Sequence, residues 1–142
     1  MTFMRLTAGR LAFAVSLLTQ VAALSAETFP FDQNLMLDTA RMGRVKRVPM
    51  LNVEANGNAT IQLWCKDVRA RVEVTDGAIR IEAEPLPDAL PSMMSDGQCS
   101  PERMQADIDI FTALVAATAW QRNGDRLVLS GPATLRFFAS SH

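Results

Sequence analysis

Histidine and cysteine are scarce in this chain of 142 residues, and their scarcity excludes several kinds of catalytic and metal site. The one histidine, His142, is the last residue of the sequence. A Ser-His-Asp triad or a Cys-His pair would therefore require the end of the chain to fold into a pocket. The two cysteines have no histidine near them in the sequence, so a zinc site built from Cys and His ligands is not expected.

Catalytic carboxylate pairs and nucleotide-binding motifs are also lacking. Asp107 and Asp109 are two positions apart on a predicted helix, so their side chains diverge. Glu82 and Glu84 share one face of a predicted strand, but that face is the solvated one. The sequence contains neither a phosphate-binding loop nor a dinucleotide fingerprint. These absences favour a protein that is not an enzyme and that uses no metal and no other cofactor.

Only one long apolar segment is present, and it lies near the start. Residues 1–26 have three parts. The start is basic and contains Arg5 and Arg10, a mainly apolar stretch of 14 residues follows at 11–24, and the segment ends in small residues. This pattern is typical of a secretory signal peptide, and the stretch is shorter than the roughly 20 residues that cross a bilayer as a helix. We predict cleavage at the end of this segment, which leaves residues 27–142 without a membrane span. An uncleaved membrane anchor is the alternative.

The charge of the remaining 116 residues is close to neutral. They carry 12 basic and 15 acidic residues, a net charge of −3. Proteins that bind nucleic acid normally present a strongly basic face, so nucleic acid is not an expected partner. The length suffices for one hydrophobic core, and no repeat or linker divides it. We therefore expect one monomeric domain in the periplasm or secreted from the cell.

Cys65 and Cys99 are the two cysteines, and we predict a disulfide between them. Two cysteines in an exported chain are more often bridged than free. Cys65 shares a strand face with Ile61 and Leu63 by the two-residue period, which directs it toward the core. A buried pair of free thiols, or two cysteines without contact, are the alternatives.

Alternating apolar and polar residues predict three hairpins. Asn56-Gly57 separates two alternating segments, a strong hairpin signal because both residue types tolerate positive φ. Thr75-Asp76-Gly77 and Asn123-Gly124 mark the other two turns. The charged residues that alternate with valine and isoleucine at 68–84 indicate an antiparallel sheet with one wet face. Leu35-Met36-Leu37 adds a further short strand.

One helix is predicted after the second cysteine. Ser100 is a suitable N-cap, Pro101 fits the first turn, and Glu102 suits the positive end of the helix dipole. Apolar residues then recur at intervals of 4, 3 and 4, at Met104, Ile108, Phe111 and Val115. This stripe predicts the face that packs on the sheet, with Phe111 buried at its middle. The expected fold is a single α+β domain. It has a curved antiparallel sheet of about seven or eight strands, with the helix between the third-last and second-last strands.

The order of these elements resembles the META domain (HslJ-like) family. Cys65 with the hairpin at 72–81 resembles the cysteine strand of that family and the hairpin that follows it. Residues 99–104 (Cys-Ser-Pro-Glu-Arg-Met) resemble its Cys-Pro-Glu-x-Met helix start. Residues 123–129 and 134–137 resemble its closing Gly-Asp-x-Leu-x-Leu and Leu-x-Phe segments. The resemblance implies an exported bacterial envelope protein, linked to stress tolerance, with no defining enzymatic activity.

The resemblance covers residues 59–138 well and residues 29–58 loosely. This chain has Trp64-Cys65-Lys66 where the family usually has Gly-Cys-Asn. It also has Ser-Asp-Gly-Gln-Cys at 95–99 where the family usually has Thr-x-Met-x-Cys. Any function that the family has at this turn is therefore in doubt in this member.

Two sequence features are candidates for a partner-binding surface. Four cations fall within seven residues, at Arg41, Arg44, Lys46 and Arg47, in a chain whose mature charge is negative. They fit an acidic partner or an anionic envelope surface, or else a solvated edge strand on which charge blocks unwanted pairing. Trp64 is predicted on the strand face opposite Ile61 and Leu63. It could be an exposed residue that contacts a partner, and the alternative is that another segment of the chain covers its ring.

The expected function is binding without catalysis. We expect an exported META-like protein that acts in envelope stress tolerance by binding an unidentified protein or envelope component. A small inhibitor of an external hydrolase is the first alternative, and it would use the 86–98 loop that Cys99 tethers. An uncharacterised enzyme is the second alternative, which would require a cleft with strongly shifted pKa values.

Overall fold

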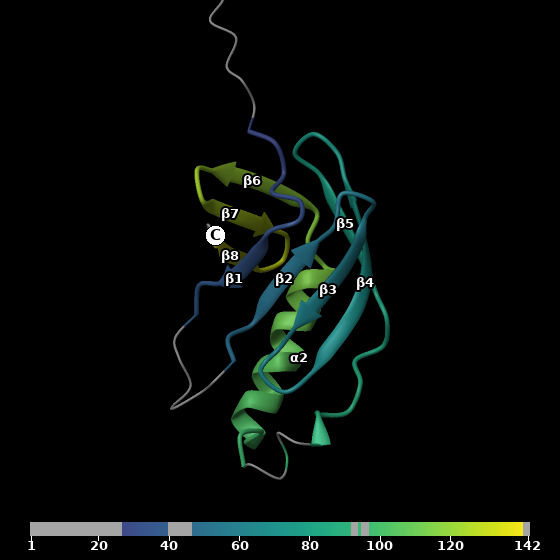
Figure 1. Ribbon diagram of the computed structural model, residues 1–142, viewed down its shortest axis with the longest axis vertical. Helices are drawn as coiled ribbons and strands as arrows, with labels where there is room; N and C mark the ends of the chain where they lie inside the picture. The colour runs from purple at the N-terminus through teal and green to yellow at the C-terminus, as the bar shows by residue number, and fades with distance from the viewer. Residues whose placement is uncertain (1–26, 40–46, 92–93, 95–96, 141–142) are drawn as a thin grey trace, which may run out of the picture.

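The computed structural model describes residues 27–39, 47–91, 94 and 97–140 (Figure 1). The predicted signal peptide at 1–26 lies outside the described residues. In the described part, no helix is long and apolar enough to span a membrane. The elements follow in the order β1 (Asn34–Leu37), β2 (Met50–Val53), β3 (Asn58–Gln62), β4 (Asp67–Val74), β5 (Ile79–Ala83), α2 (Pro101–Val115), β6 (Ala119–Asn123), β7 (Arg126–Ser130) and β8 (Thr134–Ala139).

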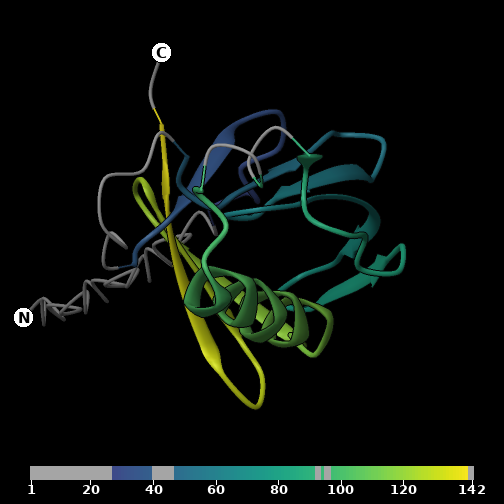
Figure 2. The same cartoon turned by 90° about the horizontal axis from the view of Figure 1, so that it is seen from below.

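The eight strands form one antiparallel sheet in the order β5-β4-β3-β2-β1-β8-β7-β6. The sheet curves until its two edges meet at a bridge between Ala78 and Ala119. Next to this bridge, the Ile79 amide donates to the Thr118 carbonyl and the Trp120 amide donates to the Gly77 carbonyl, each at 3.1 Å. The sheet is therefore nearly closed, and it curves around α2 (Figure 2). The predicted α+β class and strand number are confirmed.

The position of the helix in the chain differs from the prediction. Helix α2 precedes β6, the third-last strand, instead of following it. Residues 119–123 and 126–130 pair as a continuous hairpin, from Ala119 opposite Ser130 to Asn123 opposite Arg126, so no helix separates them. Ser100 begins α2 as predicted, because its side chain accepts a hydrogen bond from the Arg103 amide at 3.3 Å.

The three predicted hairpins are all present. Gly57 at the β2–β3 turn has φ of 91°, a conformation that L side chains rarely adopt. A Cβ atom there would also lie 2.9 Å from the Val72 carbonyl oxygen of the neighbouring strand. The amide of Val72 donates to the Gly57 carbonyl at 2.8 Å. This turn therefore requires glycine both for its backbone angles and for the close approach of β4.

The hydrophobic core fills the inside of the curved sheet. Alternate residues of each strand point inward, as the two-residue period predicts. Leu114 and Ala117, in and just after α2, complete it. The least exposed of the core residues are Leu35, Leu51, Val53, Ile61, Leu63, Leu114, Leu127 and Leu129.

The helix packs with a different face from the one predicted. Asp107 and Leu114 are the buried residues of α2, whereas Ile108 is 44% exposed and Val115 is 39% exposed. Phe111, predicted to be buried, is only partly buried. At 100° per residue, the buried face is rotated by roughly 80° from the centre of the predicted apolar stripe. As a result, Asp107 faces the core.

Candidate functional site

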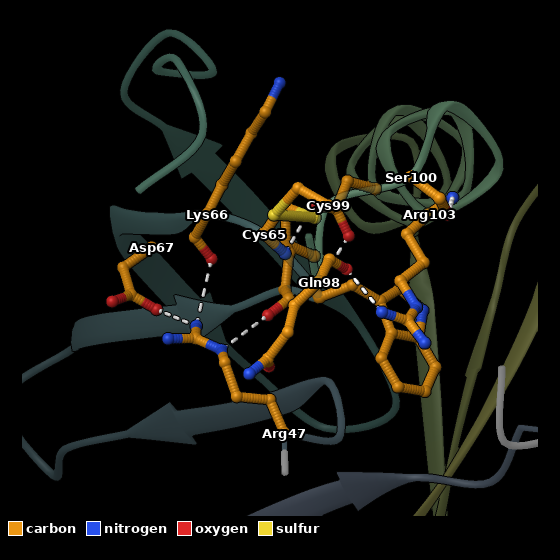
Figure 3. Close-up of a disulfide and its surroundings, with 11 residues drawn as sticks. Arg47, Cys65, Lys66, Asp67, Gln98, Cys99, Ser100 and Arg103 are labelled. Carbon is orange, nitrogen blue, oxygen red and sulfur yellow. Dashed lines mark hydrogen bonds and ion pairs between the residues drawn. A yellow bond between two sulfur atoms is a disulfide. The ribbon is translucent and has the colours of Figure 1, made fainter. Parts of the chain in front are cut away.

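The four-residue turn between β3 and β4 is held by side-chain hydrogen bonds from Asp107 and Arg47 and by a disulfide. The Leu63 amide donates to the Lys66 carbonyl at 2.7 Å and closes the turn. Cys65, inside the turn, forms the predicted disulfide with Cys99, with Cα atoms 5.6 Å apart (Figure 3). The bridge ties the turn to the residue that precedes the N-cap of α2.

Asp107 holds the inner side of this turn. Its carboxylate is fully buried and accepts hydrogen bonds from the backbone amides of Trp64 at 2.8 Å and Cys65 at 2.9 Å. Burial raises the pKa of the Asp107 carboxyl, while the two amide hydrogen bonds and the positive charges of Lys66 and Arg47 lower it. Both carboxylate oxygens have partners and neither contacts solvent, so the group fastens the helix to the turn.

Arg47 holds the outer side of the same turn. Its guanidinium donates to the carbonyls of Leu63 at 3.2 Å and Lys66 at 3.3 Å, and it pairs with the Asp67 carboxylate at 2.5 Å (Figure 3). These contacts fix Arg47 as a structural residue of the turn, with its charge balanced by Asp67. The other three candidates of the basic cluster, Arg41, Arg44 and Lys46, lie outside the described residues.

Trp64 is buried, with 1% of its surface exposed, so the prediction of an exposed contact residue is wrong. Strand β3 ends at Gln62, and the two-residue alternation ends with it. Leu63, Trp64 and Cys65 are all buried in succession because the chain turns there. The alternative, in which another part of the protein covers the ring, is the correct one.

The 86–98 loop is anchored at several points. Leu86 packs against the core cluster, and the Leu90 amide donates to the Cys65 carbonyl at 2.9 Å. The Gln98 carbonyl accepts a hydrogen bond from the Arg103 guanidinium. Residues 92–93 and 95–96 of this loop lie outside the described residues, and its role as an inhibitory loop stays a prediction.

A polar depression of about 600 Å³ lies on the outer face of β2 to β5. Its polar lining includes Asn52, Glu54, Thr60, Arg69, Arg71 and Glu84. A second hollow of about 440 Å³ shares Thr60, Arg69 and Glu84 with it and extends to Pro85 and Pro87. Because both hollows share these three residues, they form one polar surface, which we call the β3–β5 surface.

The charges on the β3–β5 surface are not matched to one another. Arg71 is fixed by Asn58, to whose side-chain oxygen it donates at 2.9 Å. The side chains of Arg69, Glu54 and Glu84, in contrast, make no hydrogen bond or ion pair with another described residue. Strand register places Arg69 directly opposite Thr60, and the Glu84 amide donates to the Arg69 carbonyl at 2.9 Å. This surface therefore offers an unpaired cation beside unpaired carboxylates.

Sequence reasoning did not select this surface. The alternating Arg and Glu residues of β4 and β5 indicate a solvated strand face, which is correct, but the pattern does not reveal a hollow. The strand register and the curvature of the sheet create it. In the described part of the chain, no group of three or more His, Cys, Asp or Glu side chains is arranged to hold a metal ion.

The comparisons with known proteins agree with the resemblance found in the sequence. No curated protein and no solved structure matches the chain significantly. The family model of the META domain matches residues 36–142. This range contains the helix, both cysteines and all eight strands, apart from the first two residues of β1. The chain therefore belongs to the META domain family.

Proposed function

We propose that this protein is an exported, non-catalytic META domain that binds a polar envelope component through the β3–β5 surface. Envelope stress tolerance is the biological role that we assign to this binding. The observation that carries the proposal is the hollow in which Arg69, Glu54 and Glu84 lack partners among the described residues.

Export is supported by two independent features. The sequence begins with the three-part pattern of a secretory signal, and the domain contains a disulfide. Disulfides persist in the periplasm and outside the cell, whereas cytosolic thiols are usually kept reduced. Both features favour a periplasmic or secreted protein.

The absence of catalysis is supported by the position of Asp107. Burial raises the pKa of the Asp107 carboxyl above its ordinary value. A general acid or base must come within hydrogen-bond reach of the substrate. Asp107 is fully buried, and both of its oxygens are occupied by backbone amides, so its raised pKa reflects a structural role.

The chemistry of the β3–β5 surface favours a polar ligand with both positive and negative groups. An unpaired guanidinium prefers a carboxylate or phosphate, and an unpaired carboxylate prefers an ammonium or hydroxyl donor. Among the described residues, no aromatic side chain lines this hollow, so there is none on which an apolar ring would stack. Envelope peptides and amino sugars have the required mixture of charges and hydrogen-bonding groups.

The test is to capture envelope components on the processed, oxidised protein and on two arginine variants. Arg69→Ala removes the unpaired cation, while Arg136→Ala is the matched control, because Arg136 is an exposed arginine of the same sheet, on β8, and lines neither hollow. We expect the wild type and Arg136→Ala to retain the same component and Arg69→Ala to lose it. Equal retention by all three proteins would place the binding surface elsewhere. Turnover of a bound component would contradict the non-catalytic assignment.

A further inference from the structure

The two hollows of the β3–β5 surface form one groove that runs along β4, the strand between β3 and β5 (Figure 1). The first hollow is lined by Arg71, the second by Asp67, and both are lined by Arg69 between them. These three residues are alternate, exposed residues of β4. At about 3.4 Å per residue the groove is about 14 Å long, which is the length of four residues of extended peptide.

The two sides of the groove carry opposite charges. Arg69 and Arg71 project from β4, and Glu82 and Glu84 line the β5 side. Strand register places Arg71 opposite Glu82, and the hydrogen bond from the Glu84 amide to the Arg69 carbonyl places these two residues opposite each other. Cations therefore recur every two residues on one side and carboxylates every two residues on the other, with about 7 Å between successive Cα atoms.

These opposite charges do not neutralise each other across the groove. A cross-strand pair of an arginine and a glutamate would be the ordinary arrangement. Arg71 instead donates to a side-chain amide oxygen on β3 at 2.9 Å, which is a neutral acceptor. Glu82 pairs with Arg80 of its own strand at 2.5 Å. The side chains of Arg69 and Glu84 make no hydrogen bond or ion pair with another described residue. Both rows of charge are thus accessible to a ligand in the groove.

We infer that the groove binds a short peptide in extended conformation whose acidic and basic side chains alternate. An extended peptide has the two-residue period of a β-strand, and its successive side chains point to opposite sides. A peptide that lies along β4 places its acidic side chains beside Arg69 and Arg71 and its basic side chains beside Glu82 and Glu84. The period of about 7 Å then matches on both sides. This inference rests on the proposed binding function of the β3–β5 surface and names the class of its ligand.

The two rows of charge disfavour ligands that carry one sign of charge only. A polyanion would meet the carboxylates of Glu82 and Glu84, and also that of Glu54 in the first hollow. A polycation would meet Arg69 and Arg71. An amino sugar chain supplies ammonium groups for the carboxylates but leaves the guanidinium row without a partner. Only the alternating peptide complements both rows, and like charges oppose the other ligands.

The test is a nuclear magnetic resonance titration of the processed, oxidised protein with two blocked tetrapeptides of the same composition. Glu-Lys-Glu-Lys has the alternating pattern. Glu-Glu-Lys-Lys is the control, because it presents one acidic and one basic side chain to each side of the groove. We expect the alternating peptide to bind in the millimolar range and to shift the amide signals of Thr60, Arg69 and Glu84, since exposed ion pairs are individually weak. The control peptide should bind at least about threefold more weakly, and added salt should weaken both.

Three variants locate the site. Arg69→Ala and Glu84→Gln each remove one charge from the groove, so each should weaken binding of the alternating peptide at least about threefold. Arg136→Ala is the control, because Arg136 is an exposed arginine on β8 that lines neither hollow, and it should leave the affinity unchanged. Melting temperatures identify any variant that is not folded.

Four results would overturn the inference. The alternating peptide does not bind, or it binds no better than the control peptide. Binding that is unchanged in both Arg69→Ala and Glu84→Gln would place the peptide outside the groove. A glucosamine tetramer that shifts the groove signals, when neither peptide does, would identify a carbohydrate ligand. In each case the binding function of the surface still stands if Arg69→Ala loses the captured envelope component, and it falls as well if Arg69→Ala retains that component.

Discussion

The Asp107 carboxylate accepts a 2.9 Å hydrogen bond from the backbone amide of Cys65, which lies 42 positions earlier in the chain. The same cysteine is joined through its sulfur to Cys99, next to the N-cap of α2. One residue of the β3–β4 turn is thus connected to the helix by a buried hydrogen bond and to the segment before the helix by a covalent bond. Both connections hold the N-terminal half of α2 against the turn.

The hydrogen bonds of Asp107 should be important for stability. Asp107→Asn replaces one acceptor oxygen by an NH₂ donor and leaves a buried amide without a partner, so we expect the free energy of unfolding to fall by about 2 kcal/mol. Asp109→Asn is the matched control, because Asp109 is exposed two positions away and should change stability by less than about 0.5 kcal/mol. Urea unfolding at neutral pH measures both. Equal effects of the two substitutions would contradict a structural role for Asp107.

The stability contribution of Asp107 should depend on pH in a defined direction. Burial raises the pKa of its carboxyl above the ordinary value of 3.8, so between 3.8 and the folded-state pKa the folded protein binds the proton more tightly than the unfolded chain. The stability from this group is therefore largest below that window and falls as the pH rises through it. The difference in unfolding free energy between wild type and Asp107→Asn should shrink on going from acidic to neutral pH. Urea unfolding of both proteins at several pH values tests this, and a difference that grows with pH would contradict it.

The disulfide should stabilise the domain without determining its fold. It closes a loop of 34 residues, which corresponds to about 3–4 kcal/mol in the chain-entropy model. The turn is also bonded to Asp107 and Arg47, and we expect these hydrogen bonds to hold it when the bridge is absent. A Cys65→Ala/Cys99→Ala double variant should therefore show native circular dichroism but a lower free energy of unfolding in guanidinium. A loss of less than about 1 kcal/mol would show that the disulfide contributes little to stability. Complete unfolding of the double variant in buffer would show that the fold requires the disulfide.

Two apolar residues of α2 should differ in their contribution to the core. Leu114 is 1% exposed, so Leu114→Ala should cost about 2–4 kcal/mol through the cavity that it leaves. Phe111 is only partly buried where it packs against the core. Phe111→Ala should therefore lower the free energy of unfolding by about 1–2 kcal/mol, instead of the roughly 3–5 kcal/mol expected for a fully buried ring. Urea unfolding of dilute protein measures both. A larger loss for Phe111→Ala than for Leu114→Ala would return the helix to the orientation predicted from its periodicity.

The sequence was sufficient for the features that depend on near neighbours in the chain. Asn56-Gly57 and Asn123-Gly124 place hairpins because positive φ is a local requirement of the turn. Alternation along β3 and β4 identifies the inward residues because the pleat has a period of two. Ser100 and Pro101 mark the start of α2 for similarly local reasons. The pairing of Cys65 with Cys99 could also be predicted, because the sequence contains no other cysteine.

The tertiary structure alone decided which face of the helix is buried, where Trp64 lies and where the polar hollow forms. Periodicity assigns an apolar stripe to the core and an aspartate to solvent, since an isolated charge is costly to bury. That reasoning fails for Asp107, because its cost is offset by two backbone amides that lie more than 40 residues away in the sequence. Trp64 is buried because the chain turns after Gln62, and the β3–β5 surface exists because register and curvature bring separate strands together. Each of these depends on contacts between segments distant in the sequence, which local patterns do not encode.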